Sequence, residues 1–140
     1  MIAHVLLVSV VLGTADDFYA FLLNINYTVR LVHQKRQAIP FRVITNGLQK
    51  PDVAAALGSS GVYKASVALM SHKPDQYAHI MQPSNNLTHS DVCAFVEALC
   101  AAGVETECTA VRQPGVDIQK AQDLAVALGA QSFRAREYFL

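Results

Sequence analysis

Residues 40–48, PFRVITNGL, decide the fold, because a short strand rich in β-branched residues ends there in an Asn-Gly turn. The same succession of apolar strand, turn and amphipathic helix continues in 63–83 (YKASVALMSHKPDQYAHIMQP), 103–125 (GVETECTAVRQPGVDIQKAQDLA) and 133–139 (FRAREYF). Strands that alternate with helices predict a mostly parallel sheet with right-handed crossovers. In such sheets the functional loops follow the carboxyl ends of the strands.

Periodicity and turn residues place the individual elements. Strands are predicted at 5–12, 41–45, 63–70, 104–111 and 131–138. Helices are predicted at 15–37, 51–57, 74–81, between Thr88 and Gly103, and at 118–128. Thr88, with Asp91 three residues later, is a capping signature, and Gly103 and Gly129 are helix stops. No linker interrupts the pattern, so we expect residues 1–140 to form a single domain.

The composition limits the classes of partner. The chain is 52% hydrophobic but only 16% charged, below the roughly 25% of a typical soluble domain, so we expect some apolar surface to be covered by a partner. Its 11 basic and 11 acidic side chains balance without any basic run, which argues against nucleic-acid binding.

The apolar N-terminal run, MIAHVLLVSVVLG (1–13), has two interpretations. It has the length of a signal-peptide core, but no Lys or Arg precedes it. It is too short for a membrane-spanning helix, which takes about 20 residues, and it is rich in Val. We favour a buried strand over 5–12, with no membrane contact and a cytoplasmic location.

Three cysteines do not form a disulfide framework. Cys93 and Cys100 are seven residues apart on one predicted helix, about 10 Å along its axis, too far for a disulfide or for one compact cluster. We therefore interpret Cys93, Cys100 and Cys108 as small buried apolar residues. The five histidines show no metal-binding spacing, so no metal site is predicted.

Two strands carry like charges at a spacing of two. Glu105 and Glu107 share a face, either as a carboxylate pair or, as we favour, as two exposed residues. Arg134 and Arg136 share a face with Ser132. Two arginines on one strand face need anions or water. They either hold a carboxylate or phosphate inside a polar barrel lumen or protect a solvated edge strand, and the sequence leaves both open.

Taken in order, these blocks resemble the later βα units of a radical S-adenosylmethionine (radical-SAM) barrel, most closely the branch encoded beside TatD-type nucleases. In the resemblance Thr45-Asn46-Gly47 ends the third barrel strand, 66–71 is the fourth, 105–111 the fifth and 133–138 the sixth. Met70 stands where that branch carries an Asn. The resemblance implies an α/β fold, a parallel (βα)5 partial TIM-like barrel of radical-SAM type.

The resemblance also implies a cofactor site. It points to Thr45, Asn46 and Ser66 as residues that contact S-adenosylmethionine, and Arg134 and Arg136, because of their charge and shared face, are the candidates to hold an anionic group. The family's Cys-x-x-x-Cys-x-x-Cys loop, which binds a [4Fe–4S] cluster, is absent, since no cysteine precedes Cys93. Gly13-Thr14-Ala15 replaces the Gly-Gly-Glu-like block that contacts the methionine amine. We therefore expect only weak binding of S-adenosylmethionine and no cluster.

The functional expectation is a truncated or divergent radical-SAM domain. The family activity is reductive cleavage of S-adenosylmethionine, which we do not expect from this chain alone. The alternative is a non-enzymatic α/β binding or scaffold domain for an anionic small ligand or a partner protein. We also expect the first strand, left as an edge, to pair with a missing N-terminal segment or with a second copy of the chain.

Overall fold

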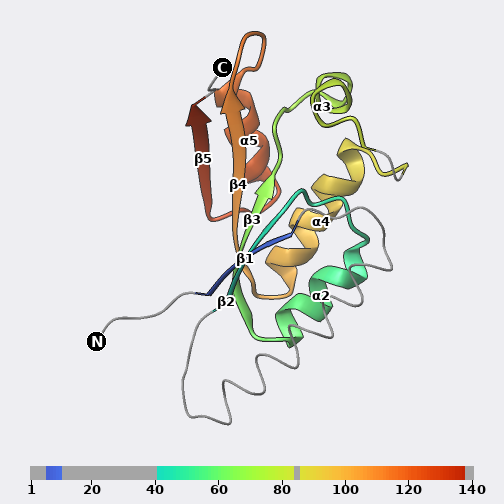
Figure 1. The fold of residues 1–140 in the computed structure, drawn as a ribbon, viewed down its shortest axis with the longest axis vertical. Helices are drawn as coiled ribbons and strands as arrows, with labels where there is room; N and C mark the ends of the chain where they lie inside the picture. Colours follow the sequence, from blue (N-terminus) through green and yellow to red (C-terminus); the bar gives the residue numbers. More distant parts are fainter. Residues whose placement is uncertain (1–5, 11–40, 84–85, 138–140) are drawn as a thin grey trace.

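The computed structural model of the chain describes residues 6–10, 41–83 and 86–137 (Figure 1). The predicted helix at 15–37 and the Gly13-Thr14-Ala15 block lie outside these residues.

A parallel sheet forms the centre of the fold (Figure 1). Its strands are β1 (Leu6–Val10), β2 (Phe41–Thr45), β3 (Val62–Ala68), β4 (Glu105–Arg112) and β5 (Ser132–Glu137). They lie side by side in chain order, and each neighbouring pair is parallel. Successive right-handed crossovers in one direction place every connecting helix on the same face of a sheet. The order therefore differs from that of a doubly wound fold, where it reverses partway.

Four helices are described: α2 (Pro51–Ser59), α3 (Pro74–Met81), α4 (His89–Ala101) and α5 (Ile118–Ala127). Pro51 and Pro74 stand at the first turns of α2 and α3, where a missing N–H costs nothing. The predicted Thr88–Asp91 capping box is confirmed, with the Thr88 N–H donating to the Asp91 carboxylate at 2.7 Å. At the start of α5, Asp117 accepts from the backbone N–H of Lys120.

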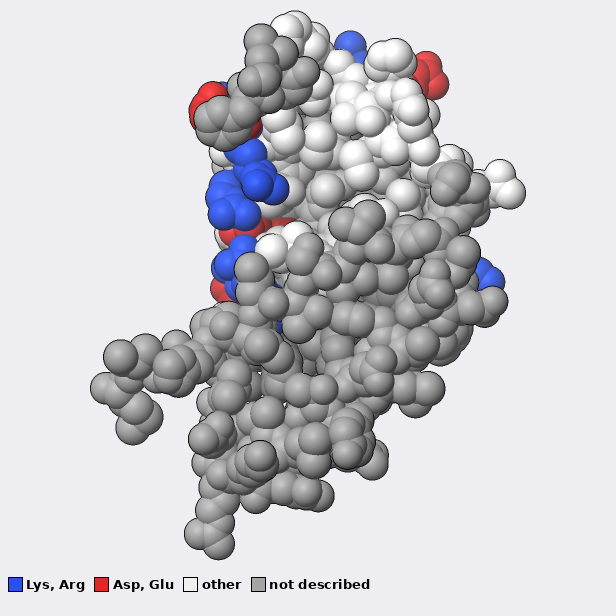
Figure 2. Space-filling view, in the orientation of Figure 1, with Lys and Arg blue, Asp and Glu red and all other residues white. Residues whose placement is uncertain are grey.

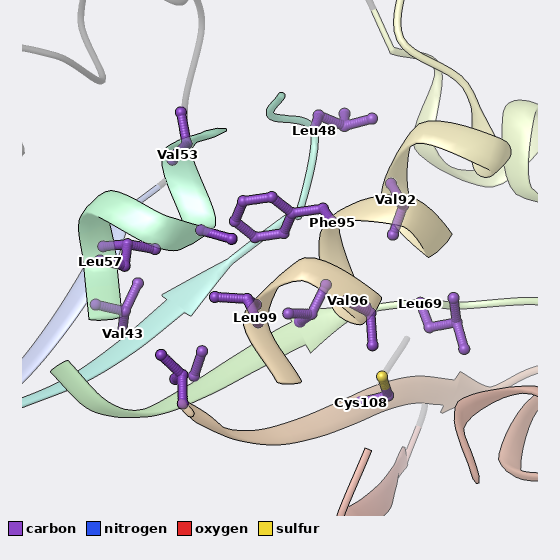
Figure 3. Close-up of a cluster of buried hydrophobic side chains, with 14 of the residues drawn as sticks. Val43, Leu48, Val53, Leu57, Leu69, Val92, Phe95, Val96, Leu99 and Cys108 are labelled. Atoms are coloured by element: carbon purple, nitrogen blue, oxygen red, sulfur yellow. The ribbon is translucent and has the colours of Figure 1, made fainter. Parts of the chain in front are cut away.

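The hydrophobic core lies between the helices and one face of the sheet (Figure 3). Val43 of β2, Val67 of β3 and Cys108 of β4 are fully buried there against Phe95 and Leu99 of α4. Since side chains alternate along a strand, the residues directly before and after each of these three point to the opposite face of the sheet. The core thereby determines which strand residues remain for a functional surface.

The turn after β2 depends on a glycine. Gly47 has φ of +72°, and a Cβ built on it would lie 2.6 Å from Cγ1 of Val67 and 3.2 Å from Cγ1 of Val92. The predicted Asn-Gly turn is therefore confirmed, and the glycine serves two needs at once: a left-handed backbone and close packing on the core.

Most predicted elements agree with the observed ones. Strand β2 and helix α3 have the predicted bounds, and α2, β3, α4, β4 and α5 differ by one to two residues at an end. The predicted ends of the first strand at 5 and 12 and of the last at 138 lie outside the described residues. The five parallel strands are observed, whereas the number of complete βα units stays a prediction, because the first connection lies outside the described residues.

Candidate functional site on the polar face of the sheet

Polar side chains gather on the sheet face opposite the helices. We call it the polar face and define its charged cluster by five residues from four strands: Arg42, Lys64, Ser66, Glu107 and Arg134. The strand register explains why these five residues lie close together. Ser66 is directly opposite Glu107 across the β3–β4 pair, and Arg134 is one diagonal step away across β4–β5.

Glu107 is the centre of the cluster. Its Oε1 atom lies 3.2 Å from Nη2 of Arg42 and 3.6 Å from Nε of Arg134. The Ser66 hydroxyl donates to the same oxygen at 3.1 Å and accepts from Nη2 of Arg42 at 2.7 Å. Nζ of Lys64 lies 4.0 Å from Oε2. One carboxylate thus receives a hydroxyl and three cations.

The cluster is buried at its centre and open at one side. The Glu107 side chain is 11% exposed, and those of Arg42 and Lys64 are 22% and 21% exposed. Arg134, on β5 at one edge of the described sheet, is 52% exposed. Figure 2 shows Lys and Arg side chains gathered along this edge of the molecule, with acidic atoms between them. A ligand from solvent therefore meets Arg134 first.

Of the residues predicted for the cofactor site, Ser66 and Arg134 meet at Glu107, as described. Arg136 lies on the same face one pleat further along β5 and is exposed. It makes no ion pair with another residue of the described ranges. It extends the positive edge without joining the cluster.

Thr45 and Asn46 lie apart from the cluster. Thr45 is in register with the core residue Val67, so it stands on the helix-covered face and is 3% exposed. Its hydroxyl accepts from the Gly47 N–H at 3.1 Å, and the Asn46 side chain accepts from the Leu48 N–H at 3.1 Å. Both side chains thus stabilise the turn after β2. Their predicted contact with a cofactor stays a prediction.

The expectation that Glu105 and Glu107 are both exposed was wrong for Glu107. Glu105 is exposed, but Glu107 is 9% exposed overall because the cations of β2, β3 and β5 surround it. Arg42 and Lys64 were not predicted as site residues. The available signal was a cation within an otherwise largely apolar strand, Arg42 in FRVIT (41–45) and Lys64 in VYKASVA (62–68), since a buried strand keeps a charge only opposite a partner.

Met70, just after β3, has φ of 64°, in the left-handed region. A long apolar side chain is uncommon there, whereas Asn tolerates it. This gives a physical reason for the Asn that the resemblance places at this position, independent of any ligand. Met70 packs against the core, so its side chain offsets some of the backbone strain.

A cavity lies on the side of the sheet that the helices cover. This cavity, of about 300 Å³ between α3 and the start of α4, is lined by Pro74, Tyr77, Leu87, His89 and other residues. The ring of Tyr77 packs edge-on against His89, and burial raises the pKa of Tyr77 to about 12, so its hydroxyl stays protonated. His89 Nε2 lies 2.9 Å from the Ser71 carbonyl oxygen. The wall is largely apolar, so the charged cluster is the stronger candidate site.

An iron–sulfur cluster is held by cysteine thiolates, and the cysteines of this chain do not suit that role. Cys108 is fully buried, and burial raises the pKa of its thiol to about 12, with Cys100, Cys93 and Glu107 adding to the shift. Burial likewise raises the pKa of Cys93. Within the described ranges no group of three or more His, Cys, Asp and Glu side chains is arranged to hold a metal ion.

The raised pKa of Cys108 predicts an unreactive thiol. In the native chain at pH 8 we expect Cys108 to react with iodoacetamide on the order of a thousandfold more slowly than in urea, because the thiolate is the reactive form. Mass spectrometry of labelled peptides measures the rate, and the half-buried Cys100 serves as the internal comparison. Equal rates for Cys108 in buffer and in urea would contradict the burial described here.

No described helix has the length and apolar character needed to cross a membrane.

Comparison with known proteins finds similarity only at the level of structure. No protein-family model matches the chain, and no curated protein matches it in sequence. Among solved structures, methylornithine synthase (PylB) matches with a TM-score of 0.64 and 12% identity over 95% of this chain and 39% of that one. The radical S-adenosylmethionine methyltransferase TsrM from Kitasatospora setae, solved with cobalamin and a [4Fe–4S] cluster, matches with a TM-score of 0.60 and 17% identity over 84% of this chain and 24% of that one.

A third similar structure is the YdjI aldolase from Escherichia coli K12, with a TM-score of 0.51 and 18% identity over 97% of this chain and 43% of that one. The chain thus spans less than half the length of each of these proteins. Since one is an aldolase, the likeness does not select a reaction. The likeness shows the fold alone: a parallel α/β sheet that is consistent with part of a TIM-like barrel.

Proposed function

We propose that this chain is a divergent radical-SAM-type domain whose charged cluster binds an anionic group of a small ligand. One observation carries the proposal: three cationic side chains from three strands converge on the single carboxylate of Glu107, and one of them, Arg134, is open to solvent. Guanidinium groups bind carboxylates and phosphates through paired hydrogen bonds, so this surplus of cations favours an anion.

Reductive cleavage of S-adenosylmethionine is not part of the proposal for this chain alone. In radical-SAM enzymes that reaction uses a [4Fe–4S] cluster, and the buried, protonated thiol of Cys108 does not suit one. In the proposal, the residues of the charged cluster bind an anionic group of the ligand and fix its orientation. The hydroxyl of Ser66 is already engaged by Arg42 and Glu107, so we assign it no nucleophilic role.

S-adenosylmethionine itself is the second candidate, favoured by the meeting of Ser66 and Arg134 at Glu107 on a radical-SAM-like sheet. Its carboxylate suits the cations, but its sulfonium is positively charged and is repelled by them. S-adenosylhomocysteine has the same carboxylate and no sulfonium charge. The two compounds therefore separate recognition of the carboxylate from recognition of the whole cofactor.

Calorimetric titration tests the proposed function. We expect S-adenosylhomocysteine to bind about fivefold more tightly than S-adenosylmethionine, because each added positive charge near the cluster costs roughly 1 kcal/mol in water. Arg134→Gln should weaken binding about tenfold through loss of one charge-assisted contact. Arg112→Gln is the matched control, since Arg112 is similarly exposed but pairs with Glu137. Anion binding that is absent, or indifferent to Arg134, contradicts the proposal.

Association through the first strand also remains a proposal. Strand β1 pairs only with β2 among the described strands, so it forms one edge of the sheet. An edge strand presents unpaired backbone groups to another strand. Its side chains lie outside the described residues, so we propose pairing with a second copy or with another segment from the backbone alone. Light scattering at rising concentration measures it.

A further inference from the structure

The charged cluster contains more hydrogen-bond donors than acceptors. Among the described residues, Glu107 Oε1 faces Arg42, Ser66 and Arg134, whereas Oε2 has only Lys64 Nζ at 4.0 Å, beyond hydrogen-bond distance. The cation-to-carboxylate distances of 3.2, 3.6 and 4.0 Å exceed the roughly 2.7–2.9 Å of a strong charge-assisted bond. Glu107 therefore does not satisfy its three cations.

Two residues that contact or pair with Glu107 each carry a buried polar atom without a hydrogen-bond partner among the described residues. The atoms are Nε of Arg42 and Oγ of Ser132. Arg42 contacts Glu107 through Nη2 rather than Nε, and Ser132 is the register partner of Glu107 on β5. Buried polar atoms are nearly always hydrogen-bonded. Two exceptions on either side of one carboxylate indicate an acceptor that is not supplied by the described side chains.

The net charge of the cluster indicates the charge of the missing anion. Arg42, Lys64 and Arg134 contribute three positive charges and Glu107 one negative charge, so the cluster has two positive charges in excess. A single carboxylate would neutralise half of this excess. Because Arg42 and Lys64 are mostly buried, solvent screens their charges only partly.

From these three observations we propose that the charged cluster binds a doubly charged oxyanion, with Arg134 and Lys64 as its cationic contacts and with Nε of Arg42 and Oγ of Ser132 as further donors. The inference rests on the proposed function for its location and adds the charge and class of the ligand. A phosphate monoester and a dicarboxylate share this chemistry. Glu107 stays in place and positions Arg42 and Arg134, since it contacts both through one oxygen.

Four simple anions test the inference at constant ionic strength. Sulfate and perchlorate are tetrahedral, with two charges and one charge, and malonate and acetate are the corresponding carboxylates. We expect a dianion to bind at least tenfold more tightly than the monoanion of its shape, measured by calorimetry and by thermal stabilisation. The tighter of sulfate and malonate identifies the ligand as phosphate-like or as a dicarboxylate.

Variants locate the binding. Arg134→Gln and Lys64→Gln should each weaken binding of the preferred dianion about tenfold, whereas Arg112→Gln should leave it unchanged. Arg134→Lys, which keeps the charge but removes the paired donors, gives a further variant should Lys64→Gln fail to fold, and we expect it to weaken binding at least threefold. Acetate bound as tightly as malonate, in an Arg134-dependent way, overturns the dianion inference and leaves the proposed function intact. No Arg134-dependent binding of any anion overturns both.

Discussion

Replacing Glu107 with glutamine is expected to lower the free energy of unfolding by about 3 kcal/mol, the cost of leaving buried cations without their counter-charge. The glutamine keeps the shape of the side chain, but Arg42 and Lys64, each about one-fifth exposed, lose the carboxylate they share. Urea unfolding followed by circular dichroism measures the change. The midpoint should fall while the denaturant dependence stays constant, because the folded surface is the same.

Glu105→Gln is the control for this substitution. Glu105 lies on the same strand and the same face, two residues before Glu107, but it is exposed. An exposed carboxylate of this kind contributes little, so the change should stay within about 0.5 kcal/mol. Similar losses for Glu105→Gln and Glu107→Gln would refute the central role of Glu107.

Gly47→Ala is expected to destabilise the chain by about 3 kcal/mol, from two causes. A left-handed backbone costs an alanine about 1–2 kcal/mol, and overpacking in a filled core costs about 1–3 kcal/mol. The second term follows from the 2.6 Å approach of the added Cβ to Val67 Cγ1, against the fully buried side chains of Val67 and Val92. The same urea titration measures it.

Gly103→Ala separates the two causes. Gly103 has φ of +80°, close to that of Gly47, yet a Cβ there meets nothing within 4 Å. It should therefore cost only the backbone term, about 1–2 kcal/mol. If the two variants lose equal stability, close packing of the turn on Val67 contributes nothing and the explanation for Gly47 is wrong.

The fold was largely predictable because its signals are local. Pro51, Pro74, the Thr88–Asp91 box and the Asn46-Gly47 pair each specify a helix start or a turn within four residues. The site was predictable only in part. Arg134 was identified because a second arginine shares its strand face, and that pairing is visible within one strand.

The rest of the site depends on register between strands. Glu107 is buried because Arg42 and Lys64, more than 40 residues earlier in the chain, lie across the sheet from it. Nothing within β4 distinguishes Glu107 from Glu105, since both are glutamates on one face. For Thr45 the strand-end rule was misleading. The residue lies at the carboxyl end of a strand, where functional residues are expected, but the pleat turns its side chain toward the helices.

The order of the strands has a consequence for how the protein is made. Each strand joins the sheet beside the one synthesised before it, so the domain can grow from the N-terminal side as it emerges from the ribosome. Three of the four strands that carry the cluster are in place before β5 is translated. Until Arg134 arrives, Glu107 sits in the last strand of a nascent sheet, with cations on one side only. The complete anion site is thus assembled when β5 joins β4, and anion affinity would report on chains that have been synthesised through β5 rather than on shorter nascent ones.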